Sequence, residues 1–156
     1  MSHHLDSDER GIILPCPACG TANRIAYAKV SQQGRCGTCK ADLPLVAAPV
    51  EMTSPAAFAA LISQSPLPVV IDFWAAWCGP CRTMAPEFER AAGLLEPRVR
   101  LAKLDIDAAP ALAAELGIQS VPTIALFARG REVARRSGAM PARQIAAWAA
   151  EAAAQP

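Results

Sequence analysis

The fold is decided by the stretch Pro68-Val-Val-Ile-Asp-Phe-Trp-Ala-Ala-Trp-Cys-Gly-Pro-Cys81. Its first half is almost continuously apolar, which predicts a central strand that is covered on both faces. Asp72 interrupts this run, and an acidic side chain in a buried strand needs a reason because burying a charge is costly. Pro80 suits the first turn of a helix. We therefore expect the strand to lead directly into a helix at Cys78 and Cys81.

The two cysteines at this junction are placed for thiol–disulfide exchange. Helix residues three positions apart share a face, and a disulfide can bridge that separation. At the helix N-terminus, unpaired backbone N–H groups and the helix dipole favour a thiolate on Cys78. Cys81 lies one turn deeper, so we expect Cys78 to be exposed and Cys81 to be shielded. The alternative is a structural disulfide or half of a metal site, which Gly-Pro between the cysteines disfavours.

The motif Trp77-Cys78-Gly79-Pro80-Cys81 resembles the active site of the thioredoxin family, and the resemblance extends from about Leu45 to the end of the chain. It implies a protein-disulfide reductase in which Cys78 attacks a disulfide of a target protein and Cys81 resolves the mixed disulfide. It also implies an NADPH-dependent thioredoxin reductase as electron donor. Since the sequence shows no dinucleotide fingerprint, we expect neither NADPH nor flavin to bind this chain directly.

Length and composition allow one ordinary domain or a small domain with an added module. The 156 residues are 53 % hydrophobic and carry a formal net charge of +1, which gives no electrostatic case for nucleic-acid or membrane binding. No stretch has the length of a transmembrane helix, and the polar N-terminus lacks the apolar region of a secretory signal. We expect a cytoplasmic protein, and we expect it to be a monomer.

The other four cysteines form a second motif ahead of the redox stretch. Cys16-Pro-Ala-Cys19 and Cys36-Gly-Thr-Cys39 are separated by sixteen residues, which is the spacing of a four-cysteine zinc site. Four thiolates complete a tetrahedral shell, so the single zinc ion would be structural rather than catalytic. Two disulfides, or iron in place of zinc, are the alternatives, and a cytoplasmic location disfavours the disulfides.

This predicted zinc module is too short to bury much apolar surface. Ile25 and Tyr27 form a minimal apolar patch, so the metal must supply much of the folding free energy. We expect the module to unfold when zinc is removed while the rest of the chain stays folded. Gly20 can adopt the positive φ of a metal knuckle, whereas Lys40 takes the equivalent position after the second pair. The few basic residues of the module are a weak footprint for nucleic acid.

The rest of the chain is expected to alternate strands and helices in the order β-α-β-α-β-α-β-β-α. This order implies a mixed sheet with helices on both faces, and it is the order of the thioredoxin fold. Its details include an edge strand within residues 45–50, a helix capped by Ser54, a strand within residues 98–107, and a helix capped by Asp107. We predict a disordered tail over residues 1–11, a four-cysteine zinc-ribbon-like module over 12–43, and a thioredoxin domain over 44–156.

The family resemblance also assigns supporting roles. Asp72 matches a carboxylate that lies beneath the second cysteine, where burial raises the pKa of a carboxyl group and allows it to take a proton from Cys81. Lys103 matches a lysine near that carboxylate. The alternatives are an Asp72 side chain exposed at a strand end and a Lys103 side chain that is an ordinary surface lysine.

The substrate groove is expected around Val121-Pro122-Thr123, which matches the cis-proline loop of the family. A cis peptide opposite the cysteine pair would leave the backbone of Val121 free to pair with an incoming chain. Gly138-Ala139 resembles the other wall of this groove. An apolar platform would come from Trp77, Gly79 and Pro80.

Two other classes of function stay open. One is a disulfide oxidant or isomerase, and the other is a non-catalytic module that binds a partner through the groove and the zinc ribbon. A further hypothesis is that oxidation of the zinc thiolates releases the metal and makes the module a redox sensor. The whole chain is most similar to the bacterial thioredoxin 2 group, whose members carry such a zinc module.

Overall fold

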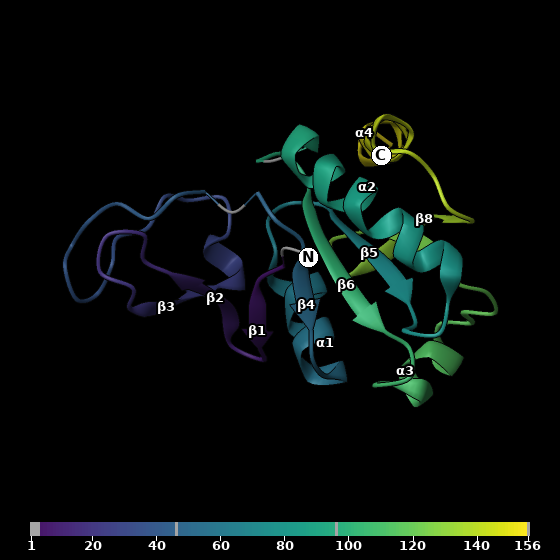
Figure 1. Cartoon of the computed structure of the whole chain (residues 1–156), viewed down its shortest axis with the longest axis horizontal. Helices are drawn as coiled ribbons and strands as arrows, with labels where there is room; N and C mark the ends of the chain where they lie inside the picture. The colour runs from purple at the N-terminus through teal and green to yellow at the C-terminus, as the bar shows by residue number, and fades with distance from the viewer. Residues whose placement is uncertain (1–3, 46, 96, 156) are drawn as a thin grey trace.

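The computed structural model describes residues 4–45, 47–95 and 97–155, which form a three-stranded sheet followed by a five-stranded sheet (Figure 1). The first sheet is antiparallel, in the order β1-β2-β3. Its elements are β1 (Asp6–Asp8), β2 (Gly11–Pro15) and β3 (Ala22–Ala26), and the short 3₁₀ turn η1 (Tyr27–Lys29) follows them.

The second sheet has the strand order β4-β6-β5-β7-β8. Strands β4, β6 and β5 run parallel, and β7 and β8 complete the sheet antiparallel. Its elements are β4 (Val50–Met52), α1 (Pro55–Gln64), β5 (Val69–Trp74), α2 (Gly79–Leu95), β6 (Arg100–Asp105), α3 (Pro110–Glu115), β7 (Thr123–Ala128), β8 (Arg131–Ser137) and α4 (Ala142–Ala153). The predicted element order and the mixed sheet are confirmed.

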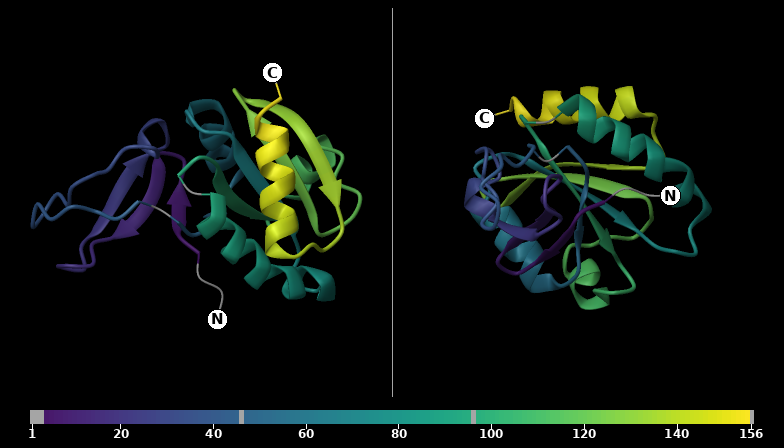
Figure 2. Two further views of the ribbon diagram at one scale, coloured as in Figure 1. Left: turned by 90° about the horizontal axis from the view of Figure 1, so that it is seen from above. Right: turned by 60° about the vertical axis from the view of Figure 1, so that its left-hand side comes forward.

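Helices cover both faces of the five-stranded sheet, with α2 and α4 together on one face and α1 and α3 on the other (Figure 2). Alternate side chains of β5 enter the two cores, because successive residues of a strand point to opposite faces. Ile71 packs with Phe58 of α1, whereas Val70 packs with Phe88 of α2 and Ile145 of α4. This two-sided burial explains the continuous apolar run in the sequence of β5.

The N-terminal sheet packs against α1 of the second sheet's domain. The side chains of Ile12, Tyr27 and Val30 belong to the same apolar core as Phe58 and Leu61. Tyr27 is fully buried, and its hydroxyl donates a hydrogen bond to the Asp8 carbonyl at 2.5 Å. Tyr27 therefore serves the contact between the two sheets rather than a patch within the module.

Residues 5–11 are ordered, which corrects the prediction of a disordered tail over residues 1–11. Strand β1 pairs with β2, with Asp6 opposite Ile13. On its other side, the Leu5 N–H donates to the Pro49 carbonyl at 2.9 Å, and the Glu51 N–H donates to the Leu5 carbonyl at 2.8 Å. Backbone hydrogen bonds on both sides hold this polar segment, and side-chain hydropathy carries no signal for them. Residues 1–3 of the predicted tail lie outside the described residues.

Two local predictions about helix starts had different outcomes. Ser54 caps α1, since its Oγ accepts a hydrogen bond from the Ala57 N–H at 3.1 Å, as predicted. Asp107 does not cap α3, because that helix begins two residues later than expected and has Ala109 at its N-cap position, without a side-chain bond. The Asp107 carboxylate instead accepts a hydrogen bond from Trp77.

The first strand of the second sheet also begins later than predicted. It starts at Val50, the last residue of the predicted range 45–50, because Pro49 has no N–H to donate to a ladder. The shift places Glu51 inside the strand, where it pairs with Lys103 of β6. None of the helices formed by the described residues is long and apolar enough to cross a bilayer.

Candidate active site and metal site

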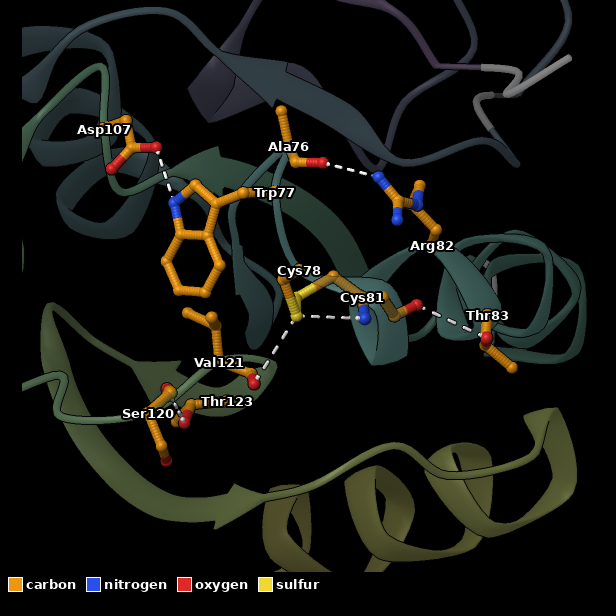
Figure 3. The surroundings of a disulfide bond; sticks show 11 residues. Ala76, Trp77, Cys78, Cys81, Arg82, Thr83, Asp107, Ser120, Val121 and Thr123 are labelled. Atoms are coloured by element: carbon orange, nitrogen blue, oxygen red, sulfur yellow. Dashed lines mark hydrogen bonds between the residues drawn. A yellow bond between two sulfur atoms is a disulfide. The ribbon is translucent and has the colours of Figure 1, made fainter.

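Cys78 and Cys81 lie where β5 leads into α2, and their sulfurs form a disulfide (Figure 3). The Cα atoms are 5.3 Å apart, which is the spacing of neighbours on one helix face. Cys78 precedes the first residue of α2, and its carbonyl accepts a hydrogen bond from the Arg82 N–H at 3.3 Å. The sequence therefore places one sulfur at the helix start and the other inside the first turn, as predicted.

A backbone donor of α2 points at the outer sulfur. The Cys81 N–H lies 3.2 Å from Cys78 Sγ, measured from nitrogen to sulfur. This N–H is one of the groups at a helix N-terminus that have no carbonyl partner within the helix. In the reduced protein it is placed to stabilise a thiolate on Cys78, with the helix dipole acting in the same direction.

Both cysteines are buried in the disulfide form, which corrects the prediction that Cys78 would be exposed. Their exposed fractions are 4 % for Cys78 and 3 % for Cys81. Cys78 and Cys81 form a small apolar cluster with Ala75, and Val121 packs against it. Trp77 of the motif is exposed, with 66 % of its surface accessible, and its indole N–H donates to Asp107 at 2.9 Å.

The loop before β7 lies against the cysteine pair, as Figure 3 shows. The Val121–Pro122 peptide bond is cis, and the Val121 carbonyl oxygen is 3.6 Å from Cys78 Sγ. Gly138 joins this loop, since its N–H donates to the Pro122 carbonyl at 2.9 Å. Ala139 lies one step further away, on a neighbouring hollow of about 380 Å³ that Met84 also lines. Gly79 and Pro80 are exposed at the start of α2.

Asp72 is buried near the inner cysteine. Its exposed fraction is 1 %, and among the described residues its Oδ1 has no hydrogen-bond partner. Burial raises the pKa of Asp72 to about 7, against a smaller lowering effect of Lys103. Asp72 and Cys81 line the same cavity of about 600 Å³. A carboxyl group in this state can exchange protons near neutral pH.

Lys103 lies beside Asp72 on the neighbouring strand. The two residues are direct partners in the β5–β6 register. Lys103 is only 8 % exposed, and its Nζ lies 4.8 Å from the centroid of the Trp74 ring. It is therefore a buried lysine in the redox region, not the surface lysine of the alternative interpretation.

The four remaining cysteines form a compact sulfur cluster at one end of the N-terminal sheet. The Sγ atoms of Cys16, Cys19, Cys36 and Cys39 all lie within 4.8 Å of one another. The Cys16–Cys39 and Cys19–Cys36 sulfur pairs are each 3.6 Å apart. A tetrahedral zinc ion with Zn–S bonds of about 2.3 Å requires sulfurs about 3.8 Å apart, so the cluster fits this metal. All four cysteines are free, in contrast to the alternative of two disulfides.

Two similar backbone turns hold the sulfur cluster. In the first, the Gly20 N–H donates to the Cys16 carbonyl at 2.8 Å, and in the second the Lys40 N–H donates to the Cys36 carbonyl at 3.1 Å. Gly20 has φ +78° and Lys40 has φ +65°, as expected for metal knuckles. The backbone N–H groups of Cys39 and Thr38 lower the pKa of the Cys36 thiol to about 6, which favours its thiolate. Against a hydrogen bond from the Ala41 N–H, burial and the neighbouring cysteines raise the pKa of the Cys39 thiol to about 11.

Comparison with known proteins assigns both parts of the chain. The family model described as Thioredoxin matches residues 49–151, and the model described as Thioredoxin 2, N-terminal, matches residues 15–41. The chain belongs to the thioredoxin family. Its Cys78–Cys81 pair is accordingly the redox-active pair of a thiol–disulfide oxidoreductase, and its N-terminal module is a zinc ribbon of the thioredoxin 2 type.

Individual thioredoxins agree with this assignment. Thioredoxin C-3 of Corynebacterium nephridii is 42 % identical over 138 residues, covering 88 % of this chain and 92 % of that protein. Among solved structures, a mutant thioredoxin from Halobacterium salinarum has a TM-score of 0.63 with 28 % identity over 70 % of this chain and 95 % of its own. The oxidised mitochondrial thioredoxin 3 of Saccharomyces cerevisiae has a TM-score of 0.60 with 32 % identity, covering 66 % and 94 %.

Sequence reasoning missed one ionisable residue of this thioredoxin's redox region. Glu51 on β4 lies opposite Lys103 and lines the cavity that Asp72 and Cys81 share. Burial raises the pKa of Glu51 to about 7, while Lys103 acts to lower it. The only signal in the sequence was its place near the expected edge strand, and the late start of β4 concealed its register.

Proposed function

We propose that this thioredoxin reduces disulfides in target proteins, and that Cys78 is its attacking thiolate. The observation that carries the proposal is the Cys81 N–H directed at Cys78 Sγ, beside the backbone carbonyl of Val121. The backbone donor supports a thiolate, and the Val121 backbone supports pairing with an extended target segment. Trp77, Gly79 and Pro80 form the proposed apolar platform, and Gly138 and Ala139 the opposite wall.

The proposed reaction passes two electrons to the target in two exchange steps. The Cys78 thiolate attacks one sulfur of the target disulfide, and the other target sulfur leaves as a thiolate that takes a proton from solvent. Asp72 accepts the Cys81 proton, and the Cys81 thiolate then attacks Cys78 Sγ. The bond between Cys78 and the target breaks, and the second target sulfur leaves with the electron pair. Lys103 is proposed to stabilise the negative charge of ionised Asp72, which burial disfavours.

The oxidised pair must then be reduced again. We propose a thioredoxin reductase as the electron donor, with NADPH bound to that enzyme and not to this chain. The reduction potential of the Cys78–Cys81 pair separates a reductase from a disulfide oxidant. A potential as oxidising as that of the periplasmic oxidants would overturn the assignment of a reductase.

The zinc ribbon is proposed to hold one structural zinc ion through Cys16, Cys19, Cys36 and Cys39. The fit of the sulfur cluster to a tetrahedron supports this, as does the complete set of four protein ligands. The proposed thioredoxin domain comprises residues 44–156, and residues 12–43 form the cysteine-bearing part of the zinc module. Release of zinc on oxidation stays a hypothesis, which zinc retention under mild peroxide would contradict.

Insulin reduction with matched cysteine variants tests the reductase. The wild-type protein should precipitate insulin chains in the presence of a reductant, and Cys78→Ser should lose this activity. Cys81→Ser should instead leave target proteins covalently attached to Cys78, since the resolving thiol is absent.

The double variant Cys78→Ser/Cys81→Ser is the control for the trapping experiment. It should attach no target, because the attacking sulfur is also absent. Full insulin reduction by Cys78→Ser would show that the proposed attacking residue is wrong and would favour a module that only binds partners.

A further inference from the structure

Three ionisable side chains form one row across the parallel strands. In the register of the sheet, Glu51 of β4 lies opposite Lys103 of β6, and Lys103 lies opposite Asp72 of β5. Directly opposed residues on parallel strands point to the same face of a sheet. Val70 and Leu101, two residues before Asp72 and Lys103, pack in the core beneath α2. The row therefore faces α2, the helix that carries Cys81.

A cavity of about 600 Å³ separates this row from α2. Glu51, Lys103 and Asp72 line it from the sheet, and Cys81 lines it from the helix. The remaining lining residues are His4, Trp74, Arg82, Ala85 and Asp105. The inner cysteine, its proposed base and Glu51 thus share one space, with a single lysine between the two carboxyl groups.

We propose that Glu51 is a positioning residue for the Cys81 step: its carboxylate competes with Asp72 for the Lys103 ammonium and keeps Asp72 basic enough to take the Cys81 proton. This inference rests on the proposed reductase function. In the step, the proton moves from Cys81 Sγ to Asp72, and the sulfur electron pair forms the bond to Cys78. Glu51 forms and breaks no bond, and acts only through charge.

The electrostatics of both carboxyl groups agree with this competition. For Asp72, burial is the largest cause of the raised pKa, Lys103 acts against it, and the negative charge of Glu51 adds to it. For Glu51, burial again dominates, and Lys103 again acts against it. The other charged groups that face Glu51 are Asp105 on β6, Asp6 on β1, and Arg82 and His4 in the cavity wall.

The N-terminal segment ahead of the zinc module holds Glu51 in this row. The Glu51 N–H donates to the Leu5 carbonyl at 2.8 Å, and the Glu51 carbonyl accepts a hydrogen bond from Ser7 Oγ at 2.6 Å. Both partners belong to the N-terminal segment that continues into β1 and β2. The backbone of Glu51 is therefore fixed between β6 on one side and the segment of Leu5 and Ser7 on the other.

The test is titration of the Asp72 carboxyl by NMR in the reduced full-length protein, with Glu51→Gln compared with wild type. Losing a negative charge two strands away should lower the Asp72 midpoint by about half to one pH unit. The pH profile of mixed-disulfide resolution should shift in the same direction. Glu51→Asp should restore most of the midpoint, since it returns the charge, and Glu51→Ala should shift it as Gln does.

Asp105→Asn is the matched control, because it removes the same charge from the same cavity one row further along, opposite Trp74. Its effect on the Asp72 midpoint should be smaller. An unchanged midpoint in folded Glu51→Gln, or an equal shift in Asp105→Asn, would overturn the role of Glu51. The titration needs no target protein, so failure of the wild type to reduce insulin would count against the proposed function alone.

Discussion

At Asp72, a carboxyl group occupies a strand whose other inward side chains are apolar, and the fold must accommodate it. The native carboxyl holds its proton up to about pH 7, whereas the unfolded carboxyl releases it near pH 3.8. Between these values the native state binds more protons than the unfolded state, so stability falls as pH rises. The contribution is complete below about pH 4 and is lost once the pH passes about 7. The proton transfer proposed for Asp72 therefore comes at the expense of stability.

Asp72→Asn should stabilise the protein at alkaline pH. A pKa shift of about three units corresponds to roughly 4 kcal/mol, so the free energy of unfolding should rise by up to about 4 kcal/mol at pH 8 and change little at pH 4. Urea unfolding across this pH range measures the difference, and insulin reduction should fall because the proposed base is absent.

The exposed Asp107 supplies the comparison for this prediction. Asp107→Asn should show no comparable pH-dependent gain, because its carboxyl group is not buried. A gain for Asp72→Asn that is the same at pH 4 and pH 8 would mean that packing, and not the carboxyl charge, sets the effect.

At the scale of elements, α2 brings the two sulfurs together and also differentiates them. Its first turn directs the Cys81 N–H at Cys78 Sγ, while Cys81 itself faces the cavity between α2 and the sheet. The apolar stripe of α2 holds the helix on the sheet through Met84, Phe88 and Leu95. The chemistry of the outer sulfur thus depends on the position of a helix terminus that the core has fixed.

Reduced Cys78 should therefore titrate well below the ordinary thiol pKa of about 8.5. The rate of alkylation by iodoacetamide, measured against pH in Cys81→Ser, reports this pKa directly. Cys78→Ser provides the comparison, since its remaining redox thiol, Cys81, lies deeper and should react slowly. A Cys78 midpoint at or above that of free cysteine would remove the physical basis of the attacking thiolate.

The sequence predicted the elements better than their edges and registers. The run Val69–Trp74 and the apolar stripe of α2 are strong signals in the sequence, because each residue pattern matches the burial of the element that it forms. The Asp107 cap failed because an acidic residue before a helix has competing partners, here the Trp77 indole. Glu51 was missed because the start of an edge strand is set by Pro49 and by backbone pairing, which hydropathy does not report. The Cys78 burial depends on Val121, which is distant in sequence.

At the scale of the whole molecule, the zinc ribbon and the thioredoxin domain share an apolar core. Ile12, Tyr27 and Val30 contribute to the cluster that contains Phe58. The cysteine spacing predicted the metal site from within one short segment. It could not predict this docking, because the partners of Tyr27 lie on α1 and a residue's neighbours across domains leave no periodic pattern in the sequence.

Zinc removal should therefore affect both parts, but unequally. We expect a strong chelator to unfold the ribbon, since the metal supplies much of its folding free energy. The thioredoxin domain should stay folded with its melting temperature lowered by roughly 5 °C, because apolar surface on α1 loses its cover. Circular dichroism and thermal melts with and without chelator measure both effects.

A variant without the metal ligands, Cys36→Ser/Cys39→Ser, is the control for the chelator itself. Its melting temperature should already be low and should not respond to chelation. If the chelator unfolded the zinc ribbon and the thioredoxin domain together, the two parts would not fold separately. An unchanged melting temperature of the thioredoxin domain would contradict a stabilising contact between them.

The hydrogen bonds between Leu5 and strand β4 have a consequence for how this molecule behaves at high concentration. An uncovered outer strand offers free amide and carbonyl groups to any extended peptide, including a second copy of the same protein. Here Leu5 and Ser7 occupy that border. A protein shortened to the redox domain would expose the backbone N–H and carbonyl groups along β4. We expect such a truncated protein to self-associate through this edge, without any change at the cysteines.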